Sequence, residues 1–186
     1  MAQTRTWRRL DLPAVERFQE EELLFGGQVE VQEAPPWSVA YRVTFAEDWV
    51  TRVAEASVHR AGAVRHLALV REPHGRWFAG DRELEACRGA LDVDLGVTPS
   101  TNTSAIRRLG LAVGASAELT AAWVRFPELS VEPLLQRYTR LEERTYLYES
   151  LRQGRVVFHA RLEVDEAGLV ERYEKLFERI DGPGPG

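Results

Sequence analysis

The sequence predicts a mainly β protein built on one large antiparallel sheet. Hydrophobic and polar residues alternate with a period of two over most of the chain, as in strands with one buried face. Turn-forming residues such as Pro73-His74-Gly75 separate the alternating runs. Few segments are long enough to be crossover helices, which parallel strands require. An antiparallel sheet of this size is expected to curl into a barrel, a half-barrel or a sandwich.

The expected strands follow one another along the chain. They lie at Thr6–Leu10, Gln28–Gln32 (after a Gly26-Gly27 turn), Val39–Phe45, Trp49–Val58, Val64–Val70, Arg76–Phe78, Ala117–Phe126, Gln136–Tyr148 and Val156–Val164. The Gln136–Tyr148 run does not alternate cleanly, so a bulge or a strong bend is expected within it.

One or two short helices interrupt this pattern. Thr101–Leu109 predicts a helix, with Thr101 or Asn102 as its cap and Ile106 among its apolar positions. Leu169–Ile180 places its apolar residues on one helical face and predicts a second helix. The turn-like residues before this second segment leave open that its first residues extend a strand instead.

Composition predicts a single domain over residues 1–181, followed by a disordered Gly-Pro tail at residues 182–186. The 186 residues are 44% hydrophobic, enough for an ordinary core. Cys87 is the single cysteine, so no intramolecular disulfide forms, which suits a reducing compartment. No secretory signal and no apolar stretch of about 20 residues is visible, so a soluble, cytoplasmic protein without a membrane segment is expected. The net charge of −5 disfavours nucleic-acid binding.

The most unusual segment is Leu91–Thr103, which reads LDVDLGVTPSTNT and is followed by Ala105-Ile-Arg-Arg-Leu109. It resembles the central signature of the putative glycolipid-binding family, formerly a domain of unknown function: an Asp-x-Asp-Leu strand end, a Thr-Pro-x-Thr-Asn-Thr loop and an Ile-Arg-Arg-Leu helix. Further elements resemble the family in order along the chain: Tyr41-Arg-Val43 with Trp49-x-Thr51, Gly75-x-Trp77, Gln136-x-Tyr138-Thr139, and Asp165-x-x-Gly168-Leu-Val170-x-x-Tyr173.

The resemblance implies a curved, incompletely closed antiparallel sheet, a half-barrel similar to the carriers of bacterial lipoproteins. It also implies a glycolipid or another amphiphile as partner, held in the groove of that sheet, without a cofactor. The sequence departs from the family at two positions. Ser100 stands where the family often has an aromatic residue, and Ala105 stands where it often has proline. A more flexible loop that lacks one ring is therefore expected.

Asp92 and Asp94 are candidate ligand-binding residues, because side chains two apart on a strand share one face. Two neighbouring carboxylates repel each other and need a partner. Arg107 or Arg108 of the following helix, a divalent cation, or sugar hydroxyls would serve. A structural ion-pair lock by the arginines is the favoured interpretation, because such pairs are the commoner use of neighbouring opposite charges.

The other candidates are polar loop residues and aromatic rings. Thr98, Asn102 and Thr103 carry the chemistry of turns and helix caps, and alternatively of a polar rim that reaches a ligand. Buried packing is the favoured interpretation for each tryptophan, because a tryptophan ring buries a large area. Trp77 follows a tight turn and is the best candidate for a partly exposed ring, with Trp37 next. Tyr138 is a further candidate ligand-binding residue.

No catalytic motif is visible. The four histidines lack metal-ligand spacing, and no Gly-x-Ser-x-Gly elbow or phosphate-binding glycine loop occurs. No metal site is expected. Two alternatives to amphiphile binding stay open: an enzyme acting on a glycosyl or acyl substrate through Asp92 and Asp94, and a protein-interaction domain that uses an exposed sheet edge.

Overall fold

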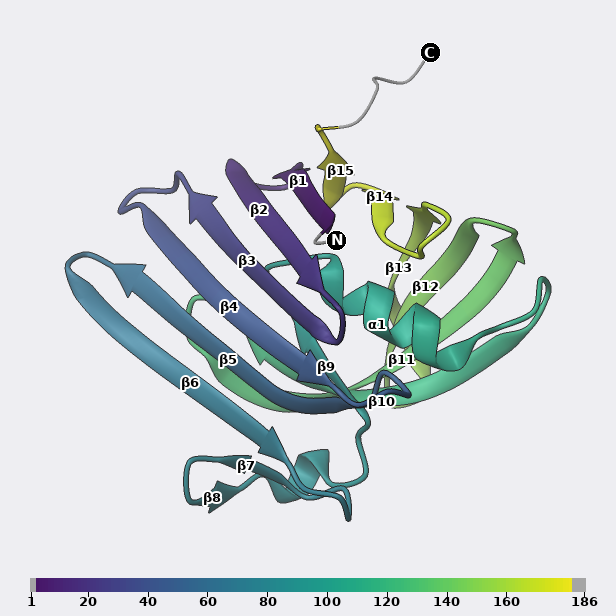
Figure 1. Ribbon diagram of the computed structural model, residues 1–186, viewed down its shortest axis with the longest axis horizontal. Coiled ribbons are helices and arrows are strands. Elements are labelled where there is room, and N and C mark those ends of the chain that lie inside the picture. Colours follow the sequence, from purple (N-terminus) through teal and green to yellow (C-terminus); the bar gives the residue numbers. More distant parts are fainter. Residues whose placement is uncertain (1–2, 182–186) are drawn as a thin grey trace.

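One strongly curved sheet makes up most of the computed structural model, which describes residues 3–181 (Figure 1). Its strands are β1 (Gln3–Arg9), β2 (Ala14–Glu21), β3 (Leu24–Val31), β4 (Trp37–Phe45), β5 (Thr51–Arg60), β6 (Ala63–Arg71), β7 (Trp77–Ala79), β8 (Arg82–Glu83), β9 (Asp92–Leu95), β10 (Ser116–Arg125), β11 (Ser130–Glu142), β12 (Thr145–Arg152), β13 (Arg155–Val164), β14 (Val170–Tyr173) and β15 (Phe177–Arg179). The helices are a 3-10 turn, η1 (Glu85–Cys87), and α1 (Ser100–Leu109). No helix within residues 3–181 is long and apolar enough to cross a membrane.

The strand order shows how the chain builds this sheet. From β1 the strands run outward one by one to β8, and from β9 they run back to β15, so that the order is β8 to β1 followed by β15 to β9. Neighbouring strands are antiparallel except β9 and β10, which are parallel. The sheet curls around α1 without closing (Figure 1). The predicted mainly β, incompletely closed architecture is confirmed.

The two halves of the sheet join at a short seam between β1 and β15. Only Trp7, Arg8 and Arg9 pair there, with Arg179, Glu178 and Phe177. Side chains reinforce the seam, because the Trp7 indole donates to the carbonyl of Val170 at 2.7 Å.

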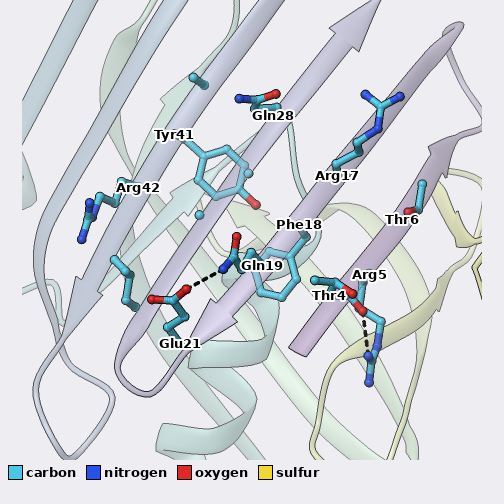
Figure 2. Close-up of a pocket in the computed structure, with 14 residues that line it drawn as sticks. Thr4, Arg5, Thr6, Arg17, Phe18, Gln19, Glu21, Gln28, Tyr41 and Arg42 are labelled. Atoms are coloured by element: carbon cyan, nitrogen blue, oxygen red, sulfur yellow. Dashed lines mark hydrogen bonds between the residues drawn. The ribbon is translucent and has the colours of Figure 1, made fainter. Parts of the chain in front are cut away.

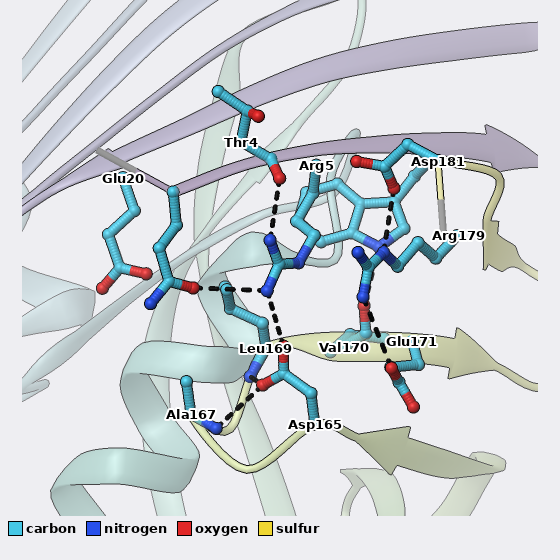
Figure 3. A network of polar contacts seen from close by, with 12 residues as sticks. Thr4, Arg5, Glu20, Asp165, Ala167, Leu169, Val170, Glu171, Arg179 and Asp181 are labelled. Atoms are coloured by element: carbon cyan, nitrogen blue, oxygen red, sulfur yellow. Dashed lines mark hydrogen bonds and ion pairs between the residues drawn. The ribbon is translucent and has the colours of Figure 1, made fainter. Parts of the chain in front are cut away.

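A polar network next to the seam joins β1 to the turn before β14 (Figure 3). Arg5 forms an ion pair with Asp165 at 2.8 Å. The other carboxylate oxygen of Asp165 accepts from the backbone N–H groups of Ala167 and Leu169, at 2.9 Å each. The turn is therefore shaped by a carboxylate that also ties it to the opposite half of the sheet.

The inner face of the sheet carries the core, and one glycine determines how the core is built near α1. Gly27 lies opposite Tyr41 on the neighbouring strand. A Cβ atom on Gly27 would overlap the Tyr41 ring. The glycine thus leaves room for the tyrosine to lie across β3 and reach Glu16 on β2.

The structure overturns two of the predicted elements. The helix over Leu169–Ile180 is wrong, because the segment forms the hairpin of β14 and β15. A turn with Lys175 at φ +67° separates the two strands, and this turn spaces the apolar residues as a helix would. The single strand over Gln136–Tyr148 is also wrong, since it turns at residues 143–144 into the β11–β12 hairpin, although the predicted bulge does occur near Arg140.

Two smaller differences concern the N-terminal half. Gly26-Gly27 lies inside β3 and forms no turn. Strand β2 was not predicted, because the inward-facing Glu16 and Glu20 interrupt its apolar alternation. The short helix was predicted correctly to within one residue, as α1.

Candidate functional site

The β9–α1 segment carries the signature residues and lies where the curved sheet remains open. Strand β9 is the last strand of its half, so one side of it has no neighbouring strand. Threonine hydroxyls accept from its outward N–H groups instead, Thr51 from Val93 at 3.1 Å and Thr101 from Leu95 at 3.2 Å. These side chains therefore satisfy backbone N–H groups that the unpaired edge of the sheet would otherwise leave without an acceptor.

Asp92 and Arg108 form the ion pair that locks β9 to α1. The guanidinium donates from Nε and Nη2 to the two carboxylate oxygens, at 2.9 and 2.6 Å. Asp92 is only 2% exposed. Burial raises the pKa of its carboxyl, while the bidentate bond to Arg108 acts in the opposite direction. This half of the predicted lock is present.

Arg107 points away from both aspartates. Its guanidinium pairs with Glu20 on β2 and donates to the carbonyl of Ala167 at 2.8 Å. It also lies over the ring of Trp49, 4.4 Å from the centroid. Arg107 thus holds α1 to both halves of the sheet.

Asp94 stands at the end of a chain of hydrogen bonds. Asn102 on α1 donates to the Tyr138 hydroxyl at 2.8 Å, and this hydroxyl contacts the Gln136 side-chain oxygen at 3.5 Å. The Gln136 amide donates to Asp94 in turn. Burial raises the pKa of Asp94 to about 6, and the hydrogen bond from Gln136 opposes the shift. No cationic side chain of residues 3–181 forms an ion pair with Asp94.

Thr98 belongs to a second buried cluster around Glu16. The carboxylate accepts from the Thr98 hydroxyl at 2.7 Å and from the Tyr41 hydroxyl. Ser100 completes the cluster, 3.0 Å from the Tyr41 oxygen. Burial raises the pKa of Glu16 to about 8, so this carboxyl is largely protonated at neutral pH.

A cavity of about 310 Å³ opens on the inner side of the sheet, beside β9 and α1. Asp94, Thr98, Asn102 and Ser150 line one part of it. Its other walls are mostly aromatic and aliphatic, namely Trp123, Leu134, Tyr148, Phe158, Tyr173, Leu176 and Phe177. The site therefore combines apolar walls with a small group of polar side chains, the composition that is typical of small-molecule pockets.

A wider and shallower hollow of about 640 Å³ lies on the outer face of β1–β4. Figure 2 shows Arg17, Gln28 and Arg42 around it, and Gly26-Gly27 leaves the strand backbone bare between them. Arg17 is paired with Glu30 across the strands. Exposed polar side chains surround this hollow, so the inner cavity is the better candidate site.

The predicted site residues fall into three groups. Asp94, Thr98 and Asn102 line the inner cavity. Asp92, Arg108 and Tyr138 do not line the cavity. Arg108 pairs with Asp92, and the Tyr138 hydroxyl accepts a hydrogen bond from the cavity residue Asn102. Trp77, Thr103 and Arg107 lie elsewhere. Trp77 is 0% exposed and its indole donates to the carbonyl of Ala90 at 2.9 Å, so it packs in the core, as favoured for the tryptophans, and is not a partly exposed ring.

Sequence reasoning did not single out the aromatic wall as part of a site. The sequence predicts Tyr148 only as the last residue of the Gln136–Tyr148 strand. Tyr173 and Phe177 were placed on a helix, so their meeting with β12 was not foreseen. The signal that would have found them is the alternation on each side of the Glu174-Lys175 turn.

The geometry bears on the two-carboxylate enzyme alternative. Asp92 is paired with Arg108 and does not line the cavity. A substrate in the cavity would therefore contact only Asp94 and not a pair of carboxylates that could act as acid and base. Within residues 3–181 no three His, Cys, Asp or Glu side chains gather in a way that would hold a metal ion. The alternative of protein interaction through an exposed edge stays a prediction.

The fold and the site together define an incompletely closed β domain with a cavity beside α1. The chain belongs to the family described as "Putative glycolipid-binding", whose model matches residues 4–179. It is also similar to the crystal structure of a DUF1089 family protein from Pseudomonas aeruginosa, with 38% sequence identity over 90% of this chain and 92% of that chain and a TM-score of 0.83. None of the curated proteins matches the sequence significantly.

Proposed function

We propose that this protein binds an amphiphile, a glycolipid or another lipid, in the inner cavity. The observation that carries the proposal is the cavity itself, which presents aromatic walls and a polar group of side chains to the same space. Apolar walls favour hydrocarbon or the flat face of a sugar ring, and polar groups fix orientation. The family description points in the same direction.

The size of the cavity limits what enters it. Its volume of about 310 Å³ lies at the lower end of the range for small-molecule sites, roughly 300–1,000 Å³. A headgroup or a short length of one chain fits, whereas a whole glycolipid with two chains does not. The remainder of such a ligand would lie along the rim.

The charge of the chain agrees with such a ligand and disfavours nucleic acid as a partner. The net charge of −5 would repel a phosphate backbone. Of the two arginines that line the cavity, Arg9 is bonded to Asp11 at 2.6 Å and Arg152 to Glu132 at 3.3 Å. The polar end of the ligand is therefore expected to carry hydroxyl groups or modest charge, and no cofactor is part of the proposal.

Native mass spectrometry of protein purified from its own cells tests the proposal. We expect a co-purified lipid, and a rise in melting temperature on adding an amphiphile, because a ligand at 100 times its Kd stabilises the fold by about 2.7 kcal/mol. Ser150→Trp would fill the cavity and abolish both effects, while Ser130→Trp, at an exposed position on β11, would not. Protein that carries no lipid and gains no stability from any amphiphile would contradict the proposal.

A further inference from the structure

Several polar atoms in the inner cavity have no partner among residues 3–181. The hydroxyls of Tyr148, Ser150 and Tyr173 make no hydrogen bond to any of residues 3–181, although these residues are only 4%, 6% and 6% exposed. The side-chain oxygen of Asn102 and Oδ1 of Asp94 are likewise free, since the bonds to Tyr138 and Gln136 use the other atom of each group. Each of these atoms is therefore available to hydrogen-bond a ligand that enters the cavity.

These groups converge on one place. The rings of Tyr148 and Tyr173 are 5.8 Å apart, centroid to centroid. The charge of Asp94 adds to burial in raising the pKa of both phenols, so both hydroxyls lie within short electrostatic range of that carboxylate. None of the unpartnered atoms is sealed inside packed protein, so they face the space of the cavity.

The chemistry of the set determines what would satisfy it. Three hydroxyls donate and accept, while the amide oxygen and the carboxylate only accept. Vicinal sugar hydroxyls also donate and accept, so a sugar satisfies every member. An alkyl chain would leave all five unpaired, a carboxylate or phosphate would be repelled by Asp94, and a quaternary ammonium has no N–H to donate.

The exposed residues that line the cavity include an apolar one as well as the charged Arg152, whose side chain is 60% exposed. Val157 lines the cavity and is 57% exposed. Leu176 also lines the cavity and is partly exposed, and its carbonyl accepts from the backbone N–H of Leu10, which is itself 43% exposed. Apolar side chains at this boundary offer a surface to a hydrocarbon chain that leaves the cavity.

We propose that the cavity takes the sugar headgroup of the ligand, and that Tyr148, Ser150, Tyr173, Asn102 and Asp94 bind its hydroxyls while the hydrocarbon chain lies outward over Val157 and Leu176. This inference rests on the proposed amphiphile-binding function and adds its orientation and its headgroup class. It reverses the arrangement expected of a lipid groove, in which the chain is buried and the head is exposed.

A series of ligands with one chain and different heads tests the orientation. Isothermal titration would compare octyl β-glucoside with octyltrimethylammonium, octylamine and octanoate, all below their micelle concentrations. We expect the glucoside to bind at least tenfold more tightly than each of the others. Methyl β-glucoside, which lacks the chain, should compete with it.

Variants that remove single hydroxyls test the residues. Tyr148→Phe, Tyr173→Phe and Ser150→Ala should each weaken glucoside binding about threefold to tenfold, the effect of one neutral hydrogen bond. Their melting temperatures should stay unchanged, because these hydroxyls have no partner to lose. Tyr146→Phe is the matched control: this tyrosine lies on the same strand, is equally buried and does not line the cavity, so its loss of a hydroxyl should not affect binding.

Three outcomes would count against the proposal in distinguishable ways. Equal affinity for all octyl compounds, insensitive to the hydroxyl variants, would show that the chain occupies the cavity and would overturn the inference while leaving amphiphile binding intact. If an ammonium compound binds most tightly and only Asp94→Asn abolishes its binding, the cavity recognises a cationic headgroup and the sugar proposal is overturned. Failure of every compound to bind would remove the proposed function together with the inference.

Discussion

Replacing Glu16 by glutamine should change how the stability of this protein depends on pH. Glu16 is 2% exposed and accepts hydrogen bonds from Tyr41 and Thr98. Burial raises its pKa from 4.5 to about 8. Glutamine has nearly the same shape as the protonated carboxyl but does not titrate, so it isolates the contribution of this one group.

The sign and the size of the effect follow from linkage. Between pH 4.5 and 8 the folded protein keeps a proton on Glu16 that the unfolded chain has lost, so the free energy of unfolding falls as the pH rises. Each pKa unit corresponds to about 1.4 kcal/mol. Glu16 should therefore remove about 3 kcal/mol of stability between pH 5 and pH 8, and Glu16→Gln should abolish that loss.

Urea unfolding of the wild type and the variant at pH 5 and pH 8 measures this difference. Other titrating groups, including Asp94, contribute equally to both proteins and cancel in the comparison. Glu30→Gln, at an exposed position on β3, is the control and should follow the wild type. If wild type and Glu16→Gln differ by the same amount at both pH values, the reasoning about a buried, protonated glutamate is refuted.

Two further variants test the contacts that build the site. Arg108→Gln should cost about 3–5 kcal/mol in urea unfolding, because it leaves a buried carboxylate unpaired, whereas Arg144→Gln, whose pair is exposed on both sides, should cost less than about 1 kcal/mol; equal costs would show that the Arg108 pair is no lock. Gly27→Ala should lower stability by about 1–3 kcal/mol through its clash with the Tyr41 ring, whereas Gly26→Ala, whose nearest neighbour would be 3.8 Å away, should be tolerated, and a tolerated Gly27→Ala would contradict the packing described.

The fold was predictable from the sequence because most strands have one buried face. The β4, β5 and β13 segments were expected within about two residues of their bounds, because buried and exposed residues alternate over β4, most of β5 and the second half of β13. Prediction failed where that simple relation breaks down. Strand β2 places carboxylates on its inner face, and a three-residue turn between β14 and β15 imitates a helical repeat.

The candidate site was predictable only in part, for a different physical reason. Local spacing placed Asp92 and Asp94 on one face of a strand and identified an arginine of the next helix as a partner. It did not distinguish Arg107 from Arg108, whose different partners depend on β2 and β9. The aromatic wall comes from β10, β12, β13, β14 and β15. Trp123 on β10 pairs with Asp94 in register, but only the curvature of the sheet brings the other strands to Asp94.

The seam between β1 and β15 has a consequence for the order of folding. Every other neighbouring pair consists of consecutive strands, with β9 and β10 joined through α1, whereas the seam pairs residues about 170 positions apart. Each half can therefore assemble from local hairpins, while the joining of the halves carries most of the loop-closure entropy. During synthesis the first half must wait as an independent unit until the final strand leaves the ribosome. Because Tyr173 and Phe177 belong to that late segment, the cavity is completed only when the seam closes.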